Sequence, residues 1–293
     1  MHKILSPTAV HALRCPYCHA TFHKLNDAEK TARTDVYVCE NGHSFDQSKQ
    51  GYLTLLGKGS EQKTADTLDM VVRRQRFLEK GFYEPFAQTV ADTLKEFLPK
   101  QESYLLGDFG AGPGYYSKAV VQALSGAECI AFDLSKRALQ RSKAEHVYPV
   151  VADTWEGFPL KDDALDGGFN IFAPRNAAEF SRVLKAGAPL IVSTPTPQHL
   201  LEIRSAADLI KIGRQDHTKR EDLHEKFDSI FDFVETRVCE FPLVLESQDV
   251  EDLVMMGPNA YHTNLADLQK VLSELPHPFE GTFSVETHIF LAR

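Results

Sequence analysis

The sequence predicts an α/β fold: a doubly wound, largely parallel sheet of seven strands, preceded by a small β domain that binds a metal ion. Three observations predict this fold. Strand and helix patterns alternate from about residue 101, a glycine-rich loop follows the first of those strands, and three cysteines lie within 25 residues near the start of the chain. Repeated strand–helix units form parallel sheets, whose ligands bind at the carboxyl ends of the strands.

Length and composition fit two globular domains. Of the 293 residues, 43% are apolar and 25% are charged, which excludes a disordered, coiled-coil or fibrous chain. No apolar run approaches the ~18 residues that a membrane helix needs, and the first residues hold no stretch long enough for a secretory signal. We therefore expect a cytoplasmic protein that does not enter a membrane.

Charge is distributed unevenly along the chain. The net charge is −9, but residues 1–80 hold 12 basic and 9 acidic residues, whereas residues 101–293 hold 18 basic and 29 acidic ones. Phosphates attract cations. If the protein binds a polyanion, the first quarter of the chain is therefore the expected contact.

The N-terminal cysteines have the spacing of a zinc site. Two pairs of donors are separated by twenty residues, and they consist of Cys15, Cys18, Cys39 and His43. Four such donors fill the tetrahedral coordination of Zn²⁺, so the site is expected to be structural. His19 and His23 are nearby alternatives for the fourth ligand, and the competing interpretation is that the thiols are unrelated. Zinc binding would supply folding energy that about 40 residues cannot obtain from burial alone.

Composition divides the chain into three parts. We expect a zinc-binding domain at 1–56, a linker with bridging helices at 57–100, and the sheet domain at 101–293. The linker is the polar, glycine-bearing stretch 57–64, and a helical pair follows at about 67–98.

The glycine-rich loop indicates which ligand the sheet binds. It follows a strand expected at 103–109 and reads Asp108-x-Gly110-x-Gly112-x-Gly114, so Tyr115 takes the place of the last glycine of a dinucleotide fingerprint. An acidic residue before the loop suits a ligand with an ammonium and a sulfonium group, and it would repel a pyrophosphate. This arrangement resembles motif I of the class I (Rossmann-like) S-adenosylmethionine-dependent methyltransferases.

The remaining strands place two further acids at the same edge of the sheet. Asp133 ends the second strand, where it is expected to accept hydrogen bonds from ribose hydroxyls, and Asp153 follows the third strand, near the expected adenine. The alternative interpretation is purely structural: the acids cap helices, and the glycine loop is a turn that binds no ligand. The other expected elements are strands at 129–132, 147–151, 165–172, 189–194, 233–244 and, antiparallel, 283–291, with helices at 116–124 and 136–145, one ending at 184, a long one after 194, and two before the last strand.

An ordered set of motifs across the chain resembles the bacterial 23S rRNA (guanine-N1)-methyltransferase A family. The set comprises Cys15-x-x-Cys18, Gly42-His43-Ser44-Phe45-Asp46, residues 51–56, Arg73-Arg74-x-Arg76-Phe77-Leu78, Gly81-x-Tyr83-x-Pro85, residues 108–116, Phe172-Ala173-Pro174 and Thr194-Pro195-x-Pro197-x-His199-Leu200. The resemblance implies an N-terminal zinc ribbon that helps to recognise a 23S rRNA hairpin, and a class I domain that binds the methyl donor. It also implies that Tyr83, Gly112, Pro113 and His199 line the cofactor site.

The function implied is methylation of N1 of a guanine in a hairpin loop of 23S rRNA, with S-adenosylmethionine as donor and Zn²⁺ as a structural ion. The N1 proton must leave, and only residue type suggests a base: Asp153, His199 or His262. Residues 170–174, which begin with Asn170, are expected to hold the edge of the guanine. A homodimer is compatible with a small recognition module that must cooperate with a distant cofactor site.

Alternatives remain open at this level. The chain could methylate a small molecule or a protein, or it could be a non-catalytic rRNA-binding protein of the same fold. The cations of 73–76 are either a solvated helix face or a grip on phosphate. The aromatic residues of the zinc module either pack its small core or stack on RNA bases, and they are Tyr17, Tyr37, Phe45 and Tyr52.

Overall fold

The computed structural model describes residues 4–25, 35–57, 66–206 and 218–293. The linker predicted at 57–64 lies outside these ranges except for its first residue. The long helix predicted after residue 194 is described only as α7 (Leu201–Ala206) and α8 (Thr218–Phe227), since the residues between them also lie outside. Within the described ranges, none of the helices combines the length and the apolar character required to cross a membrane.

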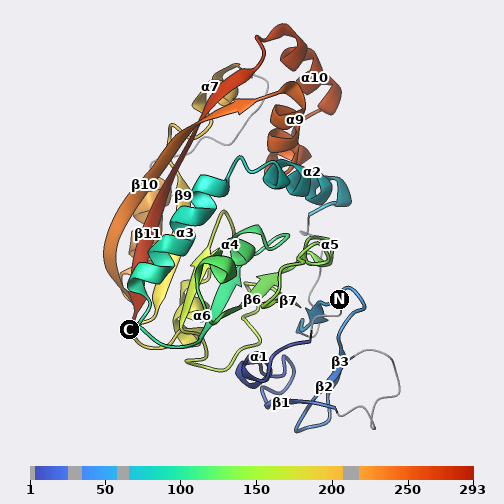
Figure 1. The fold of residues 1–293 in the computed structure, drawn as a ribbon, viewed down its shortest axis with the longest axis vertical. Helices are drawn as coiled ribbons and strands as arrows, with labels where there is room; N and C mark the ends of the chain where they lie inside the picture. The colour runs from blue at the N-terminus through green and yellow to red at the C-terminus, as the bar shows by residue number, and fades with distance from the viewer. Residues whose placement is uncertain (1–3, 26–34, 58–65, 207–217) are drawn as a thin grey trace.

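A large sheet organises the second part of the chain (Figure 1). Its order is β10-β11-β9-β8-β5-β6-β7-β4, and seven of these eight strands come from the region where seven were predicted. Five of them are parallel, and β11 is antiparallel to both β9 and β10. The seven strands are β5 (Tyr104–Phe109), β6 (Ala127–Asp133), β7 (Val147–Val151), β8 (Gly167–Asn170), β9 (Pro189–Pro195), β10 (Phe231–Leu245) and β11 (Phe279–Ala292).

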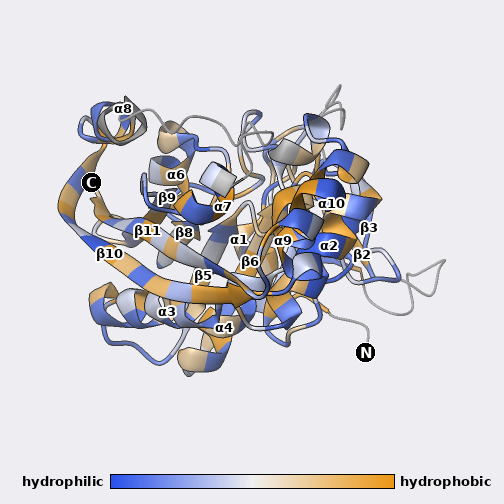
Figure 2. Cartoon of the chain, turned by 90° about the horizontal axis from the view of Figure 1, so that it is seen from above, coloured by the Kyte–Doolittle hydropathy of each residue, from blue (hydrophilic) through white to orange (hydrophobic). Residues whose placement is uncertain are grey.

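Helices cover both faces of this sheet. Viewed from above, α3 (Glu84–Phe97) and α4 (Tyr115–Ala123) lie on one side, while α6 (Ala177–Val183) and α8 lie on the other (Figure 2). Each face has its own apolar core, one built around α3 and α4 and the other around α6 and α8. The structure is therefore doubly wound, as predicted.

Two predicted elements differ in length from those observed. The helix predicted at 136–145 is only α5 (Lys136–Leu139), because the chain turns to pack Ser142 beneath the glycine loop, 2.6 Å from where a Cβ on Gly114 would stand. The strand predicted at 165–172 is the shorter β8. It ends before Phe172, whose φ of 54° is incompatible with a continuing strand.

A helical lobe stands at the far end of the long β10–β11 hairpin, at the top of Figure 1. It consists of α2 (Leu68–Glu79), α9 (Ser247–Met255), the short helix Pro258–Tyr261 and α10 (Leu265–Glu274). Together with α3, α2 confirms the predicted helical pair, and α9 and α10 confirm the two helices predicted before the last strand. The lobe therefore joins a bridging helix to a segment more than 170 residues away.

The N-terminal module is attached to the large sheet. It contains α1 (Pro7–Ala12) and an antiparallel sheet of β1 (Phe22–Lys24), β2 (Val36–Cys39) and β3 (Ser44–Asp46), and it lies beside the β7 edge in Figure 1. β4 (Leu53–Thr54) pairs in parallel with β7 and thus adds an eighth strand that the sequence did not predict. Apolar side chains of the module share one core with Ile130 and Phe132 of β6. The N-terminal module and the large sheet are therefore packed together.

Candidate functional site

The four predicted zinc ligands converge in the N-terminal module. Their ligand atoms all lie within 4.8 Å of one another. The Cys18 and Cys39 sulfurs are 3.6 Å apart, and Nδ1 of His43 lies 3.6 Å from the Cys15 sulfur and 3.5 Å from that of Cys39. Zinc–sulfur bonds of about 2.3 Å and zinc–nitrogen bonds of about 2.0 Å place tetrahedral ligands roughly 3.5–3.8 Å apart. The donor set therefore fits Zn²⁺, and His43 is the fourth ligand; His19 and His23 are exposed and lie outside the cluster.

Aromatic side chains of the module mainly build its small core. Tyr37 and Phe45 are buried, and Phe45 packs edge-on against Phe22 with ring centroids 5.4 Å apart. Tyr17 is 42% exposed, yet it packs against the ring of the ligand His43 at 5.3 Å. Core packing therefore accounts for Tyr37 and Phe45, whereas Tyr52 is half-buried and Tyr17 keeps an exposed edge beside the zinc ligands.

The glycine loop after β5 is held in a conformation that requires glycine. Gly110, Gly112 and Gly114 all have positive φ, at 97°, 55° and 76°. A Cβ on Gly110 would come within 2.2 Å of the Ala173 side chain, so the loop touches the segment after β8. Asp133 accepts a hydrogen bond from the Gly112 amide at 2.8 Å, which draws the end of β6 to the loop.

Two carboxylates lie under and beside this loop. Asp108 is buried and accepts a hydrogen bond from the Ser117 hydroxyl at 2.5 Å. Burial, with a contribution from the Asp133 charge, raises the pKa of Asp108 to about 7 despite the opposing Ser117 bond. Burial likewise raises the pKa of Asp133, although it accepts the amides of Ser135 and Gly112. Among the described residues neither acid forms an ion pair, although the Arg74 charge acts on Asp133, and such acids fit a ligand with positive charges, such as S-adenosylmethionine.

Tyr83 and His199 belong to one aromatic cluster centred on Phe283. The Phe283 ring lies 4.6 Å from Tyr83 and 5.1 Å from His199, measured between centroids. Tyr83 is buried at the start of α3, where burial raises its hydroxyl pKa. The structure thus brings together two residues that the family resemblance assigned to the cofactor site and that are 116 positions apart. Pro113 is half-buried within the loop itself.

His199 has the geometry of a hydrogen-bond donor. Its Nδ1 accepts the Ser284 amide at 3.2 Å, so a neutral ring carries its proton on Nε2. Burial, and then the Arg204 charge, lower the pKa of His199 to about 4. A neutral ring that already holds its Nε2 proton at pH 7 is a poor general base, which argues against one of the three base candidates.

The other two base candidates occupy different places. Asp153 follows β7 and accepts the Trp155 amide at 2.9 Å, and it lines a hollow of about 100 Å³ between the zinc module and the sheet domain. The Ala152 amide donates to the Asp133 carbonyl at 3.2 Å, so Asp153 adjoins the ribose candidate. His262 is exposed beyond the short helix of the helical lobe. The structure does not bring His262 into contact with the loop residues.

Asn170 ends β8 and fastens the segment expected to hold the guanine. Its side-chain nitrogen donates to the carbonyls of Phe109 and Pro174, at 2.7 and 2.9 Å. Since both neighbours are acceptors, this amide orientation is the one that satisfies them. Phe172, within the segment, is 43% exposed and adopts the left-handed backbone conformation. Such strain is concentrated at functional sites.

The cations of 73–76 are paired with carboxylates, although Arg76 is half-exposed. Arg73 donates to Glu251 at 2.5 Å and to Asp252 at 3.3 Å, and Arg76 also pairs with Asp252. Arg74 pairs with Asp66 and donates to the Met256 carbonyl at 2.6 Å. A wholly solvated helix face is therefore wrong for the buried Arg73, whereas a contact of Arg76 with phosphate stays a prediction.

Sequence reasoning missed several residues near the loop. Tyr116 is buried, and its hydroxyl is without a hydrogen-bond partner among the described residues. Arg74 stands over Gly112, with its Nη1 3.7 Å from where a Cβ would be. Arg175 has no acidic partner in the described ranges. Tyr116 and Arg74 carried a signal, because both belong to motifs of the family resemblance, whereas Arg175 carried none.

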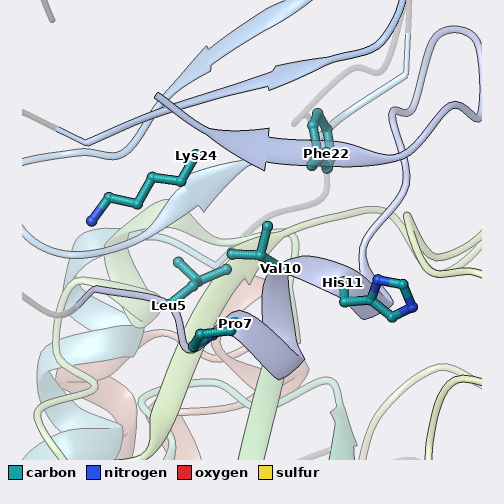
Figure 3. A pocket seen from close by; sticks show the side chains of 6 residues that line it. All are labelled: Leu5, Pro7, Val10, His11, Phe22 and Lys24. Carbon is teal, nitrogen blue, oxygen red and sulfur yellow. The ribbon is translucent and has the colours of Figure 1, made fainter. Parts of the chain in front are cut away.

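A second hollow lies inside the N-terminal module. Its volume is about 330 Å³, and Figure 3 shows α1 and β1 on opposite sides of it. The lining is mostly apolar, with the Lys24 and His11 side chains at its rim, and consists of Leu5, Pro7, Val10, His11, Phe22 and Lys24. None of the predicted cofactor residues contributes to it.

Comparison with known proteins agrees with this site. Residues 13–58 match the zinc-ribbon family model described as "RlmA, N-terminal". The chain is 35% identical to a 23S rRNA (guanine(748)-N(1))-methyltransferase of Streptomyces fradiae, over 94% of this chain and 95% of the relative. It is 34% identical to a putative 23S rRNA (guanine-N(1)-)-methyltransferase of Micromonospora griseorubida, over 97% of both chains. A Bacillus subtilis relative with a similar name is 31% identical over 65% of this chain. The chain therefore belongs to the 23S rRNA (guanine-N1)-methyltransferase family.

Proposed function

We propose that this protein methylates N1 of a guanine in a hairpin loop of 23S rRNA, with S-adenosylmethionine as donor. The observation that carries the proposal is the pairing of β4 with β7, which attaches the zinc module beside the end of the sheet that holds Asp133 and Asp153. The module proposed to recognise RNA is thus packed against the domain whose glycine loop would hold the methyl donor. Relatedness along nearly the whole chain to the Streptomyces fradiae enzyme supports the same activity.

Each of the proposed cofactor residues contacts a different part of the methyl donor. The glycine loop receives it, while each Asp133 carboxylate oxygen accepts one backbone bond and keeps a lone pair for a ribose hydroxyl. Asp153 is positioned for the adenine amino group. Tyr83, His199 and Phe283 form an aromatic wall that excludes water from one side. S-adenosylmethionine supplies an already activated methyl group, so the chain's main contribution is orientation.

Residues after β8 position the target base. Asn170 holds this segment against the glycine loop through the Phe109 carbonyl, and Ala173 lies against Gly110. A guanine bound here would face the donor across a short distance, which is the condition for in-line transfer. An unpaired base in a hairpin loop reaches such a site without the cost of leaving a duplex.

Methyl transfer from tritiated S-adenosylmethionine tests the proposal. Purified protein is incubated with total RNA, total protein and a metabolite fraction from cells that lack the gene, so that the target guanine is unmodified. Label in 23S rRNA, released by digestion as 1-methylguanosine, is the expected result. Label only in protein or metabolites overturns the proposal, and absence of both transfer and donor binding by calorimetry indicates a non-catalytic protein. The predicted homodimer is a separate question that light scattering answers.

A further inference from the structure

Arg175 is a partly buried cation, and the described residues give it no acidic partner. Its Nη2 donates to the Ser193 carbonyl at 2.9 Å, and its Nε is buried with no hydrogen-bond acceptor among the described residues. Among the residues that the structure describes, no carboxylate lies within ion-pair distance of the Arg175 guanidinium. Burial accordingly lowers the pKa of Arg175. Holding a guanidinium in this state costs free energy unless a ligand supplies an acceptor.

This arginine contrasts with the other cations near the site. Arg73, Arg74 and Arg76 are all neutralised by carboxylates from their own helix, its approach or α9. The sequence from 101 onward is strongly acidic, so RNA approaching this part of the protein needs a compensating cation. Arg175 retains the unpaired charge that could meet a phosphate.

Exposed aromatic rings lie on the segment that holds Arg175 and on the loop that is bonded to the next residue, Asn176. Phe172, three residues earlier, is 43% exposed, and its ring lies 6.0 Å from that of His199. The side chain of Asn176, the next residue, donates to the Thr154 carbonyl at 2.9 Å, which draws in the loop bearing Trp155. Trp155 is 69% exposed. Cations beside free aromatic faces are typical of sites for unpaired nucleotides.

The same segment adjoins the methyl-donor loop. Ala173 lies against Gly110, and Asn170 is bonded to the Phe109 carbonyl. Arg175 is therefore two residues beyond Ala173, where the segment after β8 contacts the glycine loop. A group bound to it would be part of the target nucleotide or of its neighbour.

We propose that Arg175 binds a backbone phosphate of the RNA strand at the target nucleotide, and that Phe172 and Trp155 offer stacking faces for unpaired bases there. The proposal rests on the function proposed above and assigns its RNA-binding residues. A guanidinium fits two oxygens of one phosphate through its fork of N–H donors. Phosphate contacts of this kind set the register of the strand and do not read its sequence.

Kinetics of the zinc-loaded full chain test Arg175. Methyl transfer to a transcribed 23S rRNA hairpin is measured for wild type, Arg175→Gln and Arg175→Lys at several salt concentrations. We expect Arg175→Gln to raise KM for RNA about tenfold with kcat within twofold, and to lower the salt slope of RNA affinity by about one. Arg175→Lys should recover part of the affinity, since it keeps the charge but not the fork.

The matched control removes a cation elsewhere. Lys185 is paired with Asp166 at 2.7 Å, before β9 begins. Lys185→Gln should leave KM and the salt slope unchanged. All variants are checked for zinc content, thermal unfolding and donor affinity by calorimetry, and a lower donor affinity in Arg175→Gln would assign the arginine to the cofactor and overturn the proposal.

Trp155 gives an independent readout, because it is the single tryptophan of the chain. Adding the hairpin should quench its fluorescence, whereas adding S-adenosylmethionine alone should not. Absence of quenching when anisotropy shows that the RNA is bound contradicts a stacking role.

Failures of the two proposals are distinguishable. An active wild type whose Arg175→Gln variant keeps its KM and salt slope overturns the phosphate contact and leaves the function standing. A fall in kcat with a shifted pH profile and an unchanged slope would place Arg175 on the guanine, which also overturns it. If the wild type transfers no methyl group to RNA, the function fails, and the anisotropy Kd and its salt slope still decide the role of Arg175.

Discussion

The side-chain nitrogen of Asn170 lies 2.7 Å from the carbonyl oxygen of Phe109, and this bond ties the end of β8 to the beginning of the glycine loop. The substrate side and the donor side of the site are thus fixed to each other through two neighbouring parallel strands. A change in either side is transmitted to the other, because Ala173 and Gly110 are also in contact there.

Gly110→Ala should remove donor binding. The new Cβ would stand 2.2 Å from the Ala173 side chain at a φ of 97°, so loop and segment must separate. We expect donor affinity to fall more than tenfold in calorimetry. Gly187→Ala is the control, since Gly187 also has a positive φ of 77° but open space around it. It should cost only about 1–2 kcal/mol of unfolding free energy and leave donor affinity intact; equal effects of both variants would contradict the account.

Asp108→Asn should stabilise the donor-free protein and weaken donor binding. The carboxyl has a pKa of about 7 in the fold against an ordinary 3.8, so the folded state binds more protons than the unfolded state between these values. Wild-type stability therefore declines as pH rises from about 4 to about 7, relative to the variant, and the difference is constant above that. The difference in unfolding free energy between variant and wild type is at most about 4 kcal/mol.

Urea denaturation from pH 4 to pH 9 measures this difference, and calorimetry measures donor affinity. The Ser117 hydroxyl can still donate to the amide oxygen of the variant, so the local hydrogen bond remains. A variant less stable than wild type at pH 8, or one with unchanged donor affinity, would show that the Asp108 charge has another role.

Loss of zinc should destabilise both domains. The module shares its core with β6, and Leu55 donates its amide to the Val151 carbonyl at 3.0 Å. We expect one zinc ion per chain by mass spectrometry, and Cys39→Ser or a chelator should lower the melting temperature of the whole protein. Cys239→Ser, in β10, is the control and should retain the metal. An unchanged transition of the sheet domain after zinc removal would mean that the module folds independently.

Asp252→Asn should loosen the helical lobe. Asp252 is buried and accepts from Arg73 and Arg76, so the substitution removes the carboxylate paired with Arg76 and one of the carboxylates paired with Arg73. Because Arg76 is half-exposed, we expect a loss of roughly 2–3 kcal/mol, below the range for fully buried pairs. Glu96→Gln breaks the exposed pair with Arg237 and should cost less stability than Asp252→Asn. Urea denaturation that gives equal losses would contradict the buried role.

Local patterns predicted most of the fold and the metal ligands. Each strand at 103–151 and 189–291 has its own apolar run, and the four zinc ligands are close in sequence, so no distant information is needed to find them. The acids likewise lie at the carboxyl ends of strands, Asp108 as the penultimate residue of β5 and Asp133 as the last residue of β6. Their positions could be predicted from spacing alone.

Features that depend on distant partners could not be predicted. β4 has only two residues, and it is a strand because β7 lies beside it. Arg73 and Arg76 were interpreted as solvent-facing or RNA-facing because their acidic partners are about 176 residues away. The importance of Arg175 depends on which carboxylates are absent from its surroundings, and a sequence does not state this.

Mapping modified nucleotides in 23S rRNA tests the central claim most directly. Ribosomal RNA from cells with and without the gene is digested and analysed by mass spectrometry, with the guanine equivalent to that named for the Streptomyces fradiae relative included. The account predicts a single 1-methylguanosine in a hairpin loop that disappears with the gene and returns when purified protein and S-adenosylmethionine are added to the unmodified RNA. Identical modification profiles in both strains, together with no transfer in the reconstituted reaction, would contradict it.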